Sequence, residues 1–230
     1  MAEVRPETPS VKTFRLAFAE GVDFSFIPGQ FAMVAFPAEP DQTRAYSLAS
    51  SPLDKGHIEI AFAKAGAFTA RMFELKEGDK LLVEGPYGRW LYKDDVEHAV
   101  CLCGGTGITP FRSMIRYVTQ KKLPNRLTLL YSSKTADDIV FRNETHEWAE
   151  NKNVKIVQTL TRPGIADLTG AWDGRTGRLS LDVIKEEVPD FAAATFYMCG
   201  PNQFVADLAK ALEGAGIPKE RIRYEKWGEF

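Results

Sequence analysis

The chain has 230 residues, of which 44% are hydrophobic and 26% are charged, and its formal net charge at pH 7 is −2. This composition is typical of a folded protein with one large or two small domains, and the balanced charge offers no basic field for nucleic acid. No apolar run approaches the roughly 20 residues that a membrane helix needs, and the opening segment MAEVRPETPS lacks the basic and apolar regions of a signal peptide. We therefore expect a cytoplasmic protein without nucleic-acid or membrane partners.

The first 95 residues are expected to form an antiparallel β domain. Short runs rich in β-branched and aromatic residues recur between turn signals such as PGQ, SPLDKG and KEGD, a spacing that predicts a barrel or a sandwich. Residues 67–75, AFTARMFEL, are an exception, because their apolar positions fit a short amphipathic helix better than a strand. The expected strands cover residues 11–18, 31–36, 44–50, 57–63 and 80–85.

After the segment KDDVE, residues 93–97, apolar runs alternate with amphipathic segments. This alternation predicts an α/β domain over residues 96–230, built on a doubly wound parallel sheet whose strands are buried on both faces. The expected strands cover residues 98–104, 126–132, 154–160 and 194–200, and the expected helices cover 111–120, 141–150, 181–188 and 204–216.

The chain has three cysteines, Cys101, Cys103 and Cys199. They are too few for a disulfide framework, and they fall short of the four thiolates that usually hold an iron–sulfur cluster. We expect no metal site, so any redox chemistry here needs another carrier.

Two unusual segments follow strands of the predicted parallel sheet. The first strand runs into GGTGITP, residues 104–110, where glycines let a ligand approach the backbone and the N–H groups of the next helix favour phosphate. The last strand ends in YMCGP, residues 197–201, which places Cys199 at the same edge of the sheet. A tight connection and an inert core cysteine are the alternatives, but the two segments together favour a ligand site.

The segment RAYSLASSP, residues 44–52, carries a cation, an aromatic ring and hydroxyls on one predicted strand. Because side chains alternate along a strand, Arg44 and Tyr46 share one face, which offers a guanidinium for phosphate and a ring for stacking, while Ser47 faces the other way. A cross-strand Arg–Tyr pair on a solvated face is the alternative. AGAFT, residues 65–69, supplies a helix N-terminus that can bind a second phosphate.

Taken in order, RAYSLASS, GAFT, EGPYG (84–88), GGTGITPFRSM (104–114) and YMCGP resemble the ferredoxin-NADP reductase family. The resemblance covers almost the whole chain and implies an antiparallel β-barrel that binds FAD over residues 1–95, followed by an α/β domain that binds NAD(P) over residues 96–230.

The resemblance also implies roles for individual residues. Arg44 would pair with the flavin pyrophosphate, Tyr46 would stack on the isoalloxazine ring, and Ser47 would bond near the nitrogen that accepts hydride. It assigns FAD contacts to Arg44, Ala45, Tyr46, Ser47, Ala61, Phe62, Ala63, Ala67, Phe68 and Thr69, and NAD(P) contacts to Gly105, Thr106, Gly107, Pro110, Thr161, Arg162, Cys199, Gly200 and Pro201.

Plant-type members of the family end on a tyrosine that stacks over the flavin, whereas this sequence ends RYEKWGEF. Trp227 or Phe230 could take that place, with Glu225 as the nearby carboxylate, and an edge strand that only packs the sheet is the alternative. Ser47, Cys199 and Glu225 are the predicted catalytic residues.

The choice between NADP and NAD rests on a few charged residues. Thr161 and Arg162 match a pair that faces the extra phosphate in NADP-using relatives, which favours NADP. Asp137 and Asp138 follow another strand end and count for NAD.

The resulting hypothesis is an FAD-dependent NAD(P)H oxidoreductase. A flavin can accept the two electrons of a hydride and release them one at a time. Because no further cysteine set is available for a fused ferredoxin, the acceptor is expected to be a separate ferredoxin, flavodoxin or oxygenase component. An electron-transfer subunit of a larger flavoenzyme complex and a free-flavin reductase are the alternatives.

Overall fold

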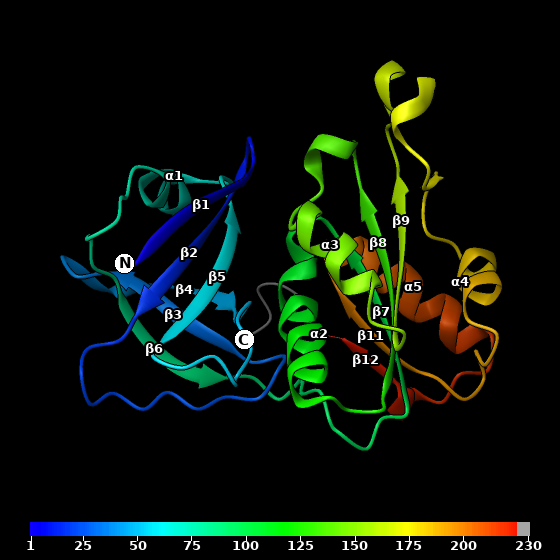
Figure 1. Cartoon of the computed structure of the whole chain (residues 1–230), viewed down its shortest axis with the longest axis horizontal. Helices are drawn as coiled ribbons and strands as arrows, with labels where there is room; N and C mark the ends of the chain where they lie inside the picture. Colours follow the sequence, from blue (N-terminus) through cyan, green and yellow to red (C-terminus); the bar gives the residue numbers. More distant parts are fainter. Residues whose placement is uncertain (225–230) are drawn as a thin grey trace. The chain divides into compact units, whose positions relative to one another are not determined.

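The computed structural model describes residues 1–224 and divides into two compact units (Figure 1). The first unit holds Met1–Tyr92 together with Thr109–Lys121, and the second holds Lys93–Ile108 together with the chain from Lys122 onward. The segment Thr109–Lys121 therefore belongs by its contacts to the first unit, although it lies within the second domain in the sequence. The predicted boundary after residue 95 stays a prediction.

The first unit contains two antiparallel sheets of three strands, in the orders β1-β2-β5 and β4-β3-β6. An isolated bridge between Leu48 and Ile60 joins the end of one sheet to the other. Their elements are β1 (Glu3–Thr8), β2 (Val11–Ala17), β3 (Phe31–Phe36), β4 (Glu39–Ser47), β5 (His57–Ala63), α1 (Ala67–Phe73) and β6 (Leu82–Tyr87).

Apolar side chains of both sheets and of α1 form a single core in this unit. Phe14 and Phe62 meet edge to face with ring centroids 4.7 Å apart, a favoured aromatic geometry. Met72, the buried residue of α1, lies in the same core, which explains why this short helix forms where the period of the apolar residues changes. The core thus fixes α1 against β4 and β5.

The second unit is built on a parallel sheet of six strands in the order β10-β9-β8-β7-β11-β12. All seven residues of β7 are buried, as expected for a central strand covered on both faces. The strands are β7 (His98–Gly104), β8 (Arg126–Ser133), β9 (Val154–Leu160), β10 (Arg175–Thr176), β11 (Thr195–Cys199) and β12 (Ile222–Tyr224). The helices are α3 (Arg142–Ala149), α4 (Leu181–Glu187) and α5 (Asn202–Gly214), and α2 (Thr109–Lys121) is the helix grouped with the first unit.

Helices cover both faces of this sheet. Val100 of β7, Phe196 of β11 and Leu208 of α5 share one buried cluster with residues of α4, so α4 and α5 pack on one face. On α3, the Oγ1 of Thr145 accepts a hydrogen bond of 3.0 Å from the Nε2 of Gln158, which neighbours buried Val157 along β9 and points to the opposite face. This two-sided cover is that of a doubly wound fold.

The predicted fold class is confirmed. Every expected strand and helix is present within a few residues of its predicted bounds, except that β4 begins at Glu39, well before the start expected at residue 44. The sequence reading missed β1 and β10, because β1 is only partly buried and β10 has two residues. Arg223 and Tyr224, the first residues of RYEKWGEF, lie in β12 at the edge of the sheet, as in the edge-strand alternative for that segment. Such strands are decided by pairing with a neighbour and carry little pattern of their own.

Candidate functional site

Arg44 and Tyr46 point to the same side of β4, toward α1. The exposed guanidinium of Arg44 lies 5.3 Å from the centre of the Phe68 ring, and the hydroxyl of Tyr46 donates to the Sδ of Met72 at 3.4 Å. The Tyr46 ring also meets Phe62 edge to face, with centroids 5.9 Å apart. The predicted sharing of one face is therefore confirmed, since both side chains contact residues of α1.

Tyr46 is held as a neutral phenol with one side of its ring fixed. Burial raises the pKa of Tyr46 to about 12, and the nearby Arg44 only partly offsets that rise. Since Met72 and Phe62 lie against it, the ring is oriented before any ligand arrives. A pre-oriented aromatic ring is what stacking on a flat cofactor requires.

The two strands that carry the predicted flavin contacts are both edge strands. β4 is at one edge of its sheet and β5 is at one edge of the other, so each has one backbone edge outside the ladder of the described strands. The bridge between Leu48 and Ile60 places Ser47 close to Ala61, because each is the next residue along from a bridge partner. Ala61 and Phe62 have buried side chains, so their expected contacts would come from backbone groups, as predicted.

The start of α1 leaves amides available for phosphate. The Oγ1 of Thr69 accepts hydrogen bonds from the N–H groups of Ala65 at 2.8 Å and Gly66 at 3.0 Å, which caps the helix from within. The N–H groups of Ala67, Phe68 and Thr69 lie in the first turn, where a helix has no intrahelical acceptor for them. The hydroxyl of Thr69 is thus committed to the cap, and its predicted ligand contact falls to its amide.

In the second unit, β7 ends at Gly104 and a 3-10 turn, Gly105–Ile108, leads into α2. Gly105 has φ of +56°, and a Cβ added there would meet nothing within 4 Å. Gly107 is the opposite case, because a Cβ there would lie 2.3 Å from the carbonyl oxygen of Cys199 and 2.8 Å from the Cα of Gly200. The GGTG turn therefore packs backbone to backbone against the Cys199–Gly200 turn, a contact that only glycine permits.

The parallel pairing explains why these two segments meet. Cys103 of β7 is the register partner of Cys199 of β11, so both strands end at the same edge of the sheet. The structure confirms the expected meeting of GGTGITP and YMCGP, with Thr106 between Gly105 and Gly107, Pro110 in the first turn of α2, and Gly200 and Pro201 directly after β11. This edge is where open parallel sheets bind ligands.

The three thiols are buried, and Cys199 is only 3% exposed. Burial raises the pKa of the Cys103 thiol, and its neighbours Cys101 and Cys199 raise it further. Burial likewise raises the pKa of Cys101. The thiols of Cys101 and Cys103 are accordingly protonated at physiological pH and are not nucleophiles.

Thr161 and Arg162 follow β9 and lie beside the end of β8. The N–H of Thr161 donates to the carbonyl of Ser133 at 2.9 Å, and the N–H of Arg162 donates to the carbonyl of Lys134 at 2.8 Å. The side chain of Arg162 is exposed. At the neighbouring strand end, the Oδ2 of Asp138 accepts hydrogen bonds from the N–H and the hydroxyl of Thr135. Asp138 is therefore committed to a local turn, which leaves Asp137 as the exposed acidic residue of this strand end.

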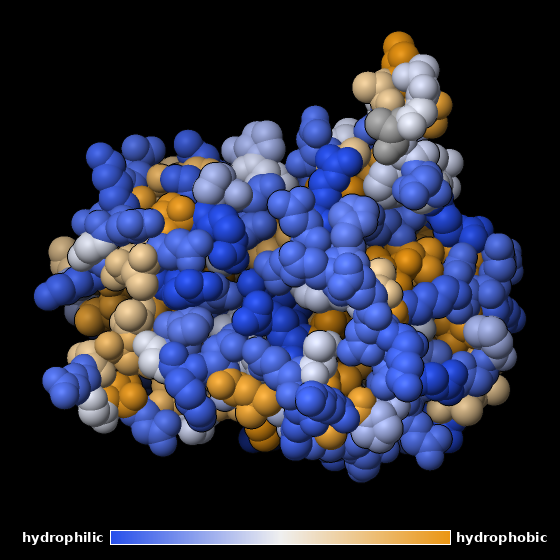
Figure 2. All heavy atoms as spheres, viewed as in Figure 1, coloured by the Kyte–Doolittle hydropathy of each residue, from blue (hydrophilic) through white to orange (hydrophobic). Residues whose placement is uncertain are grey.

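The loop after Arg162 carries an apolar tip. Ile165 is 83% exposed and Leu168 is 63% exposed, and the projecting segment between β9 and β10 is orange at its end in Figure 2. Arg175, which closes the loop, forms ion pairs with Glu186 at 2.8 Å and Glu187 at 2.7 Å. Arg175 is thus held by α4.

Comparison with known proteins gives two matches to family models and a set of relatives. An oxidoreductase FAD-binding domain matches residues 2–92, and an oxidoreductase NAD-binding domain matches residues 101–210. The gamma subunit of sulfhydrogenase 1 from Pyrococcus furiosus is 30% identical over 223 residues, which are 94% of this chain and 73% of that protein. The chain belongs to the oxidoreductases that combine an FAD-binding domain with an NAD-binding domain, and its fold is that of ferredoxin-NADP reductases.

Other members of the family are similar over nearly the whole chain. The reductase component of propane 2-monooxygenase from Rhodococcus jostii is 27% identical over 99% of this chain and 62% of that protein. The chain thus spans somewhat under two thirds of the length of the first curated relatives that it matches. Among solved structures, the ferredoxin reductase of carbazole 1,9a-dioxygenase has a TM-score of 0.85 at 24% identity, covering 98% of this chain and 67% of that one. A ferredoxin NADP+ reductase from Neisseria gonorrhoeae has a TM-score of 0.80 at 22% identity, covering 100% and 96%.

The residues of this family member fit both cofactors. The ring of Tyr46, the guanidinium of Arg44, the first-turn amides of α1 and the open edges of β4 and β5 suit a flat ring joined to a pyrophosphate. In the second unit, the open space at Gly105 and the glycine-dependent packing at Gly107 suit a nucleotide at the strand ends. Ala45 and Ala63 belong to the same two edge strands.

Two groups of residues complete the comparison with the sequence predictions. Glu225, Trp227 and Phe230 lie outside the described residues 1–224, so their roles stay predictions. Sequence reading missed a polar row on α2, residues 112, 116 and 120, whose spacing of four in a largely buried helix was the available signal.

Among the described residues, no helix has the length and apolarity required to cross a membrane.

Proposed function

We propose that this chain transfers electrons from NAD(P)H, through FAD, to a separate protein carrier such as an oxygenase component, a ferredoxin or a flavodoxin. The observation that carries the proposal is the packing of Gly107 against Cys199 and Gly200 at the carboxyl ends of β7 and β11. A nucleotide-binding turn of this kind, in a chain that also has a FAD-binding domain, suits hydride exchange between two cofactors. A cytoplasmic location is part of the same proposal.

The residues of the chain would bind and orient, while the bound flavin supplies the step from a two-electron donor to a one-electron acceptor. Arg44 and the first-turn amides of α1 would neutralise the flavin pyrophosphate, and Tyr46 would fix the plane of the ring. Ser47 would donate a hydrogen bond near the ring atom that accepts hydride. Cys199 would shape the place of the nicotinamide, with Thr106 beside it.

The experiment that tests this proposal is an anaerobic absorption spectrum of the purified protein before and after addition of NADPH or NADH. A bound yellow flavin that bleaches at once supports the proposal, and the faster nucleotide identifies the donor. A protein that stays colourless after FAD is supplied contradicts it. Loss of flavin during gel filtration, with activity restored by free flavin, would instead identify a free-flavin reductase.

We further propose that NADPH is the preferred donor, because exposed Arg162 stands at the end of β9 beside Lys134. Arg162→Ala should raise the KM for NADPH much more than the KM for NADH. Equal losses for the two nucleotides would contradict this assignment.

An electron-transfer subunit of a larger complex is the second candidate, favoured by the similarity to a subunit of the Pyrococcus furiosus sulfhydrogenase. Purification of the protein from its native cells, without overexpression, distinguishes the two candidates. A stable complex with other subunits supports the second candidate, whereas a chain that turns over an added carrier by itself supports the first.

A further inference from the structure

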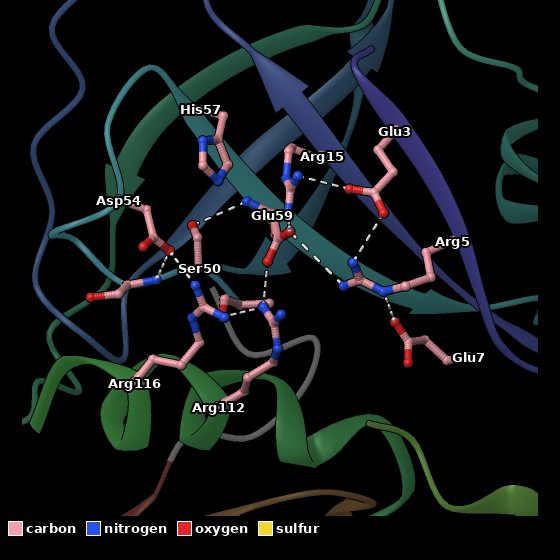
Figure 3. Close-up of polar contacts among 12 residues, drawn as sticks. Glu3, Arg5, Glu7, Arg15, Ser50, Asp54, His57, Glu59, Arg112 and Arg116 are labelled. Atoms are coloured by element: carbon pink, nitrogen blue, oxygen red, sulfur yellow. Dashed lines mark hydrogen bonds and ion pairs between the residues drawn. The ribbon is translucent and has the colours of Figure 1, made fainter. Parts of the chain in front are cut away.

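One face of α2 is polar and lies against the connection between β4 and β5 (Figure 3). Arg112, Arg116 and Gln120 are spaced by four residues and therefore share this face. The Nη2 of Arg116 donates to Asp54 at 3.0 Å, and the Nε2 of Gln120 donates to the other oxygen of Asp54 at 2.9 Å. Arg112, in the first turn of α2, makes the deepest of these contacts.

Arg112 bonds to β5 and to the segment that follows β4, next to the predicted flavin contacts. Its Nη1 donates to the carbonyl of Ala49 at 2.9 Å and to the carboxylate of Glu59, which Figure 3 shows at the centre of the group. Ala49 follows Ser47 by two residues, and Glu59 precedes Ala61 by two residues. One guanidinium thus links the first turn of α2 to the ends of both flavin-binding segments.

The pair between Arg112 and Glu59 is fully buried, and its carboxylate is charged at neutral pH. Arg112 is 2% exposed and Glu59 is 1% exposed. Burial by itself would raise the pKa of Glu59, but the charge and hydrogen bond of Arg112, with help from Arg5 and Arg15, lower it to about 2. Arg15 also pairs with Glu59, at 2.8 Å.

Buried ion pairs are costly to desolvate, and well-packed apolar residues of similar volume are often as stable or more so. Stability alone therefore does not explain this pair, and we attribute its role to the geometry that it fixes. Arg112 lies three residues after Thr109, where α2 begins directly after the Gly105–Ile108 turn that would bind the nucleotide phosphates.

We propose that Arg112 is a positioning residue for hydride transfer, which holds the start of α2 to the Ala49 carbonyl and to Glu59. This inference rests on the proposed function. Arg112 acts through the first turn of α2, which continues directly from the turn proposed to bind nucleotide; its hydrogen bonds hold that first turn to the Ala49 carbonyl and to Glu59. Since misplacement of about 1 Å can cost roughly 100-fold in rate, loss of this link should slow the reaction without preventing binding.

Stopped-flow reduction of the bound flavin by NADPH and NADH tests the proposal. Arg112→Met should lower the limiting rate at saturating nucleotide by about 10- to 100-fold. The half-saturating concentration of nucleotide and the flavin content should stay within about threefold of wild type. Arg15 remains beside Glu59, so the substitution leaves no isolated buried carboxylate. Arg112→Lys, which keeps a charged donor, should restore part of the rate.

Arg116→Met is the matched control, because it removes an ion pair of the same face one turn further from the nucleotide turn. Its limiting rate should stay within about twofold of wild type. A wild-type limiting rate in Arg112→Met overturns the proposal, and so does loss of flavin in that variant, which would make Arg112 a support of the flavin site.

Glu59→Gln provides the second route if Arg112→Met does not fold. The glutamine keeps the shape of the side chain and one hydrogen-bond acceptor but removes the charge. The limiting rate of flavin reduction should fall while flavin stays bound, and an unchanged rate overturns the proposal. If neither nucleotide reduces the flavin of the wild type, the proposed function falls and this inference with it. If the flavin of the wild type is reduced and the variants are reduced equally fast, only the positioning role of Arg112 is contradicted.

Discussion

Gly107→Ala should separate the Gly105–Ile108 turn, which we propose to bind nucleotide, from the turn after β11. The added Cβ would lie 2.3 Å from the carbonyl oxygen of Cys199, and real Cβ contacts essentially never fall under 3.0 Å. All three nearest atoms belong to backbone, so no side chain can rotate away and one of the two turns must move. Overpacking of this kind costs about 1 to 3 kcal/mol, which corresponds to a fall in Tm of about 3 to 10 °C for a chain of this size.

Thermal melting and anaerobic flavin reduction together measure the effect. We expect the nucleotide concentration for half-maximal flavin reduction to rise about tenfold, equivalent to about 1.4 kcal/mol of lost binding, while flavin content stays unchanged. Gly164→Ala is the control in the same unit, because the nearest atom to its added Cβ is a carboxylate oxygen of Asp167 at 3.7 Å. If Gly107→Ala melts and binds nucleotide like Gly164→Ala, the backbone packing of the two turns is not required for stability or for nucleotide binding.

Four further predictions follow from single residues. Tyr46→Ala should weaken flavin binding about fivefold, from about 1 kcal/mol of ring contact, whereas Tyr46→Phe should not; equal dissociation constants would refute the stacking role. Because the pKa of Glu59, about 2, lies below its ordinary 4.5, its stabilisation is complete above pH 4.5 and is lost as pH falls toward 2. The Tm difference between wild type and Glu59→Gln should therefore shrink from pH 7 to pH 3.5, and a constant difference would contradict this. Cys199→Ala should slow flavin reduction and spare flavin content, which an absorption spectrum decides. Ser180 caps α4 by accepting from the N–H of Val183, so Ser180→Ala should cost about 1 kcal/mol in urea unfolding, with no effect on nucleotide binding.

The local patterns were sufficient for the longer, buried elements and for the candidate ligand segments, but not for β1 and β10. The β-rich runs VKTFRLAF and HIEIAFA between turn signals predict strands, and the continuous apolar run HAVCLCG predicts a strand buried on both faces. The same patterns place Arg44 beside Tyr46 on one face, as the structure confirms. These features depend on backbone periods of a few residues, which any sequence displays directly.

Contacts between distant segments were beyond the reach of these patterns. The sequence assigns α2 to the α/β domain, yet its polar face bonds to the β4–β5 connection, and its contacts group it with the β unit. Nothing local indicates that Arg112 meets Glu59, since both read as ordinary surface charges until the fold buries them.

The sequence by itself therefore determined the two domain classes, the order of the strands along the chain and the glycine-rich turns, because each follows from short-range backbone preference. Only the tertiary structure decided that Gly107 must be glycine on account of Cys199, and that a buried ion pair ties α2 to β5. The physical reason is that close packing and desolvation of charge depend on which surfaces meet, and that is settled by the whole chain.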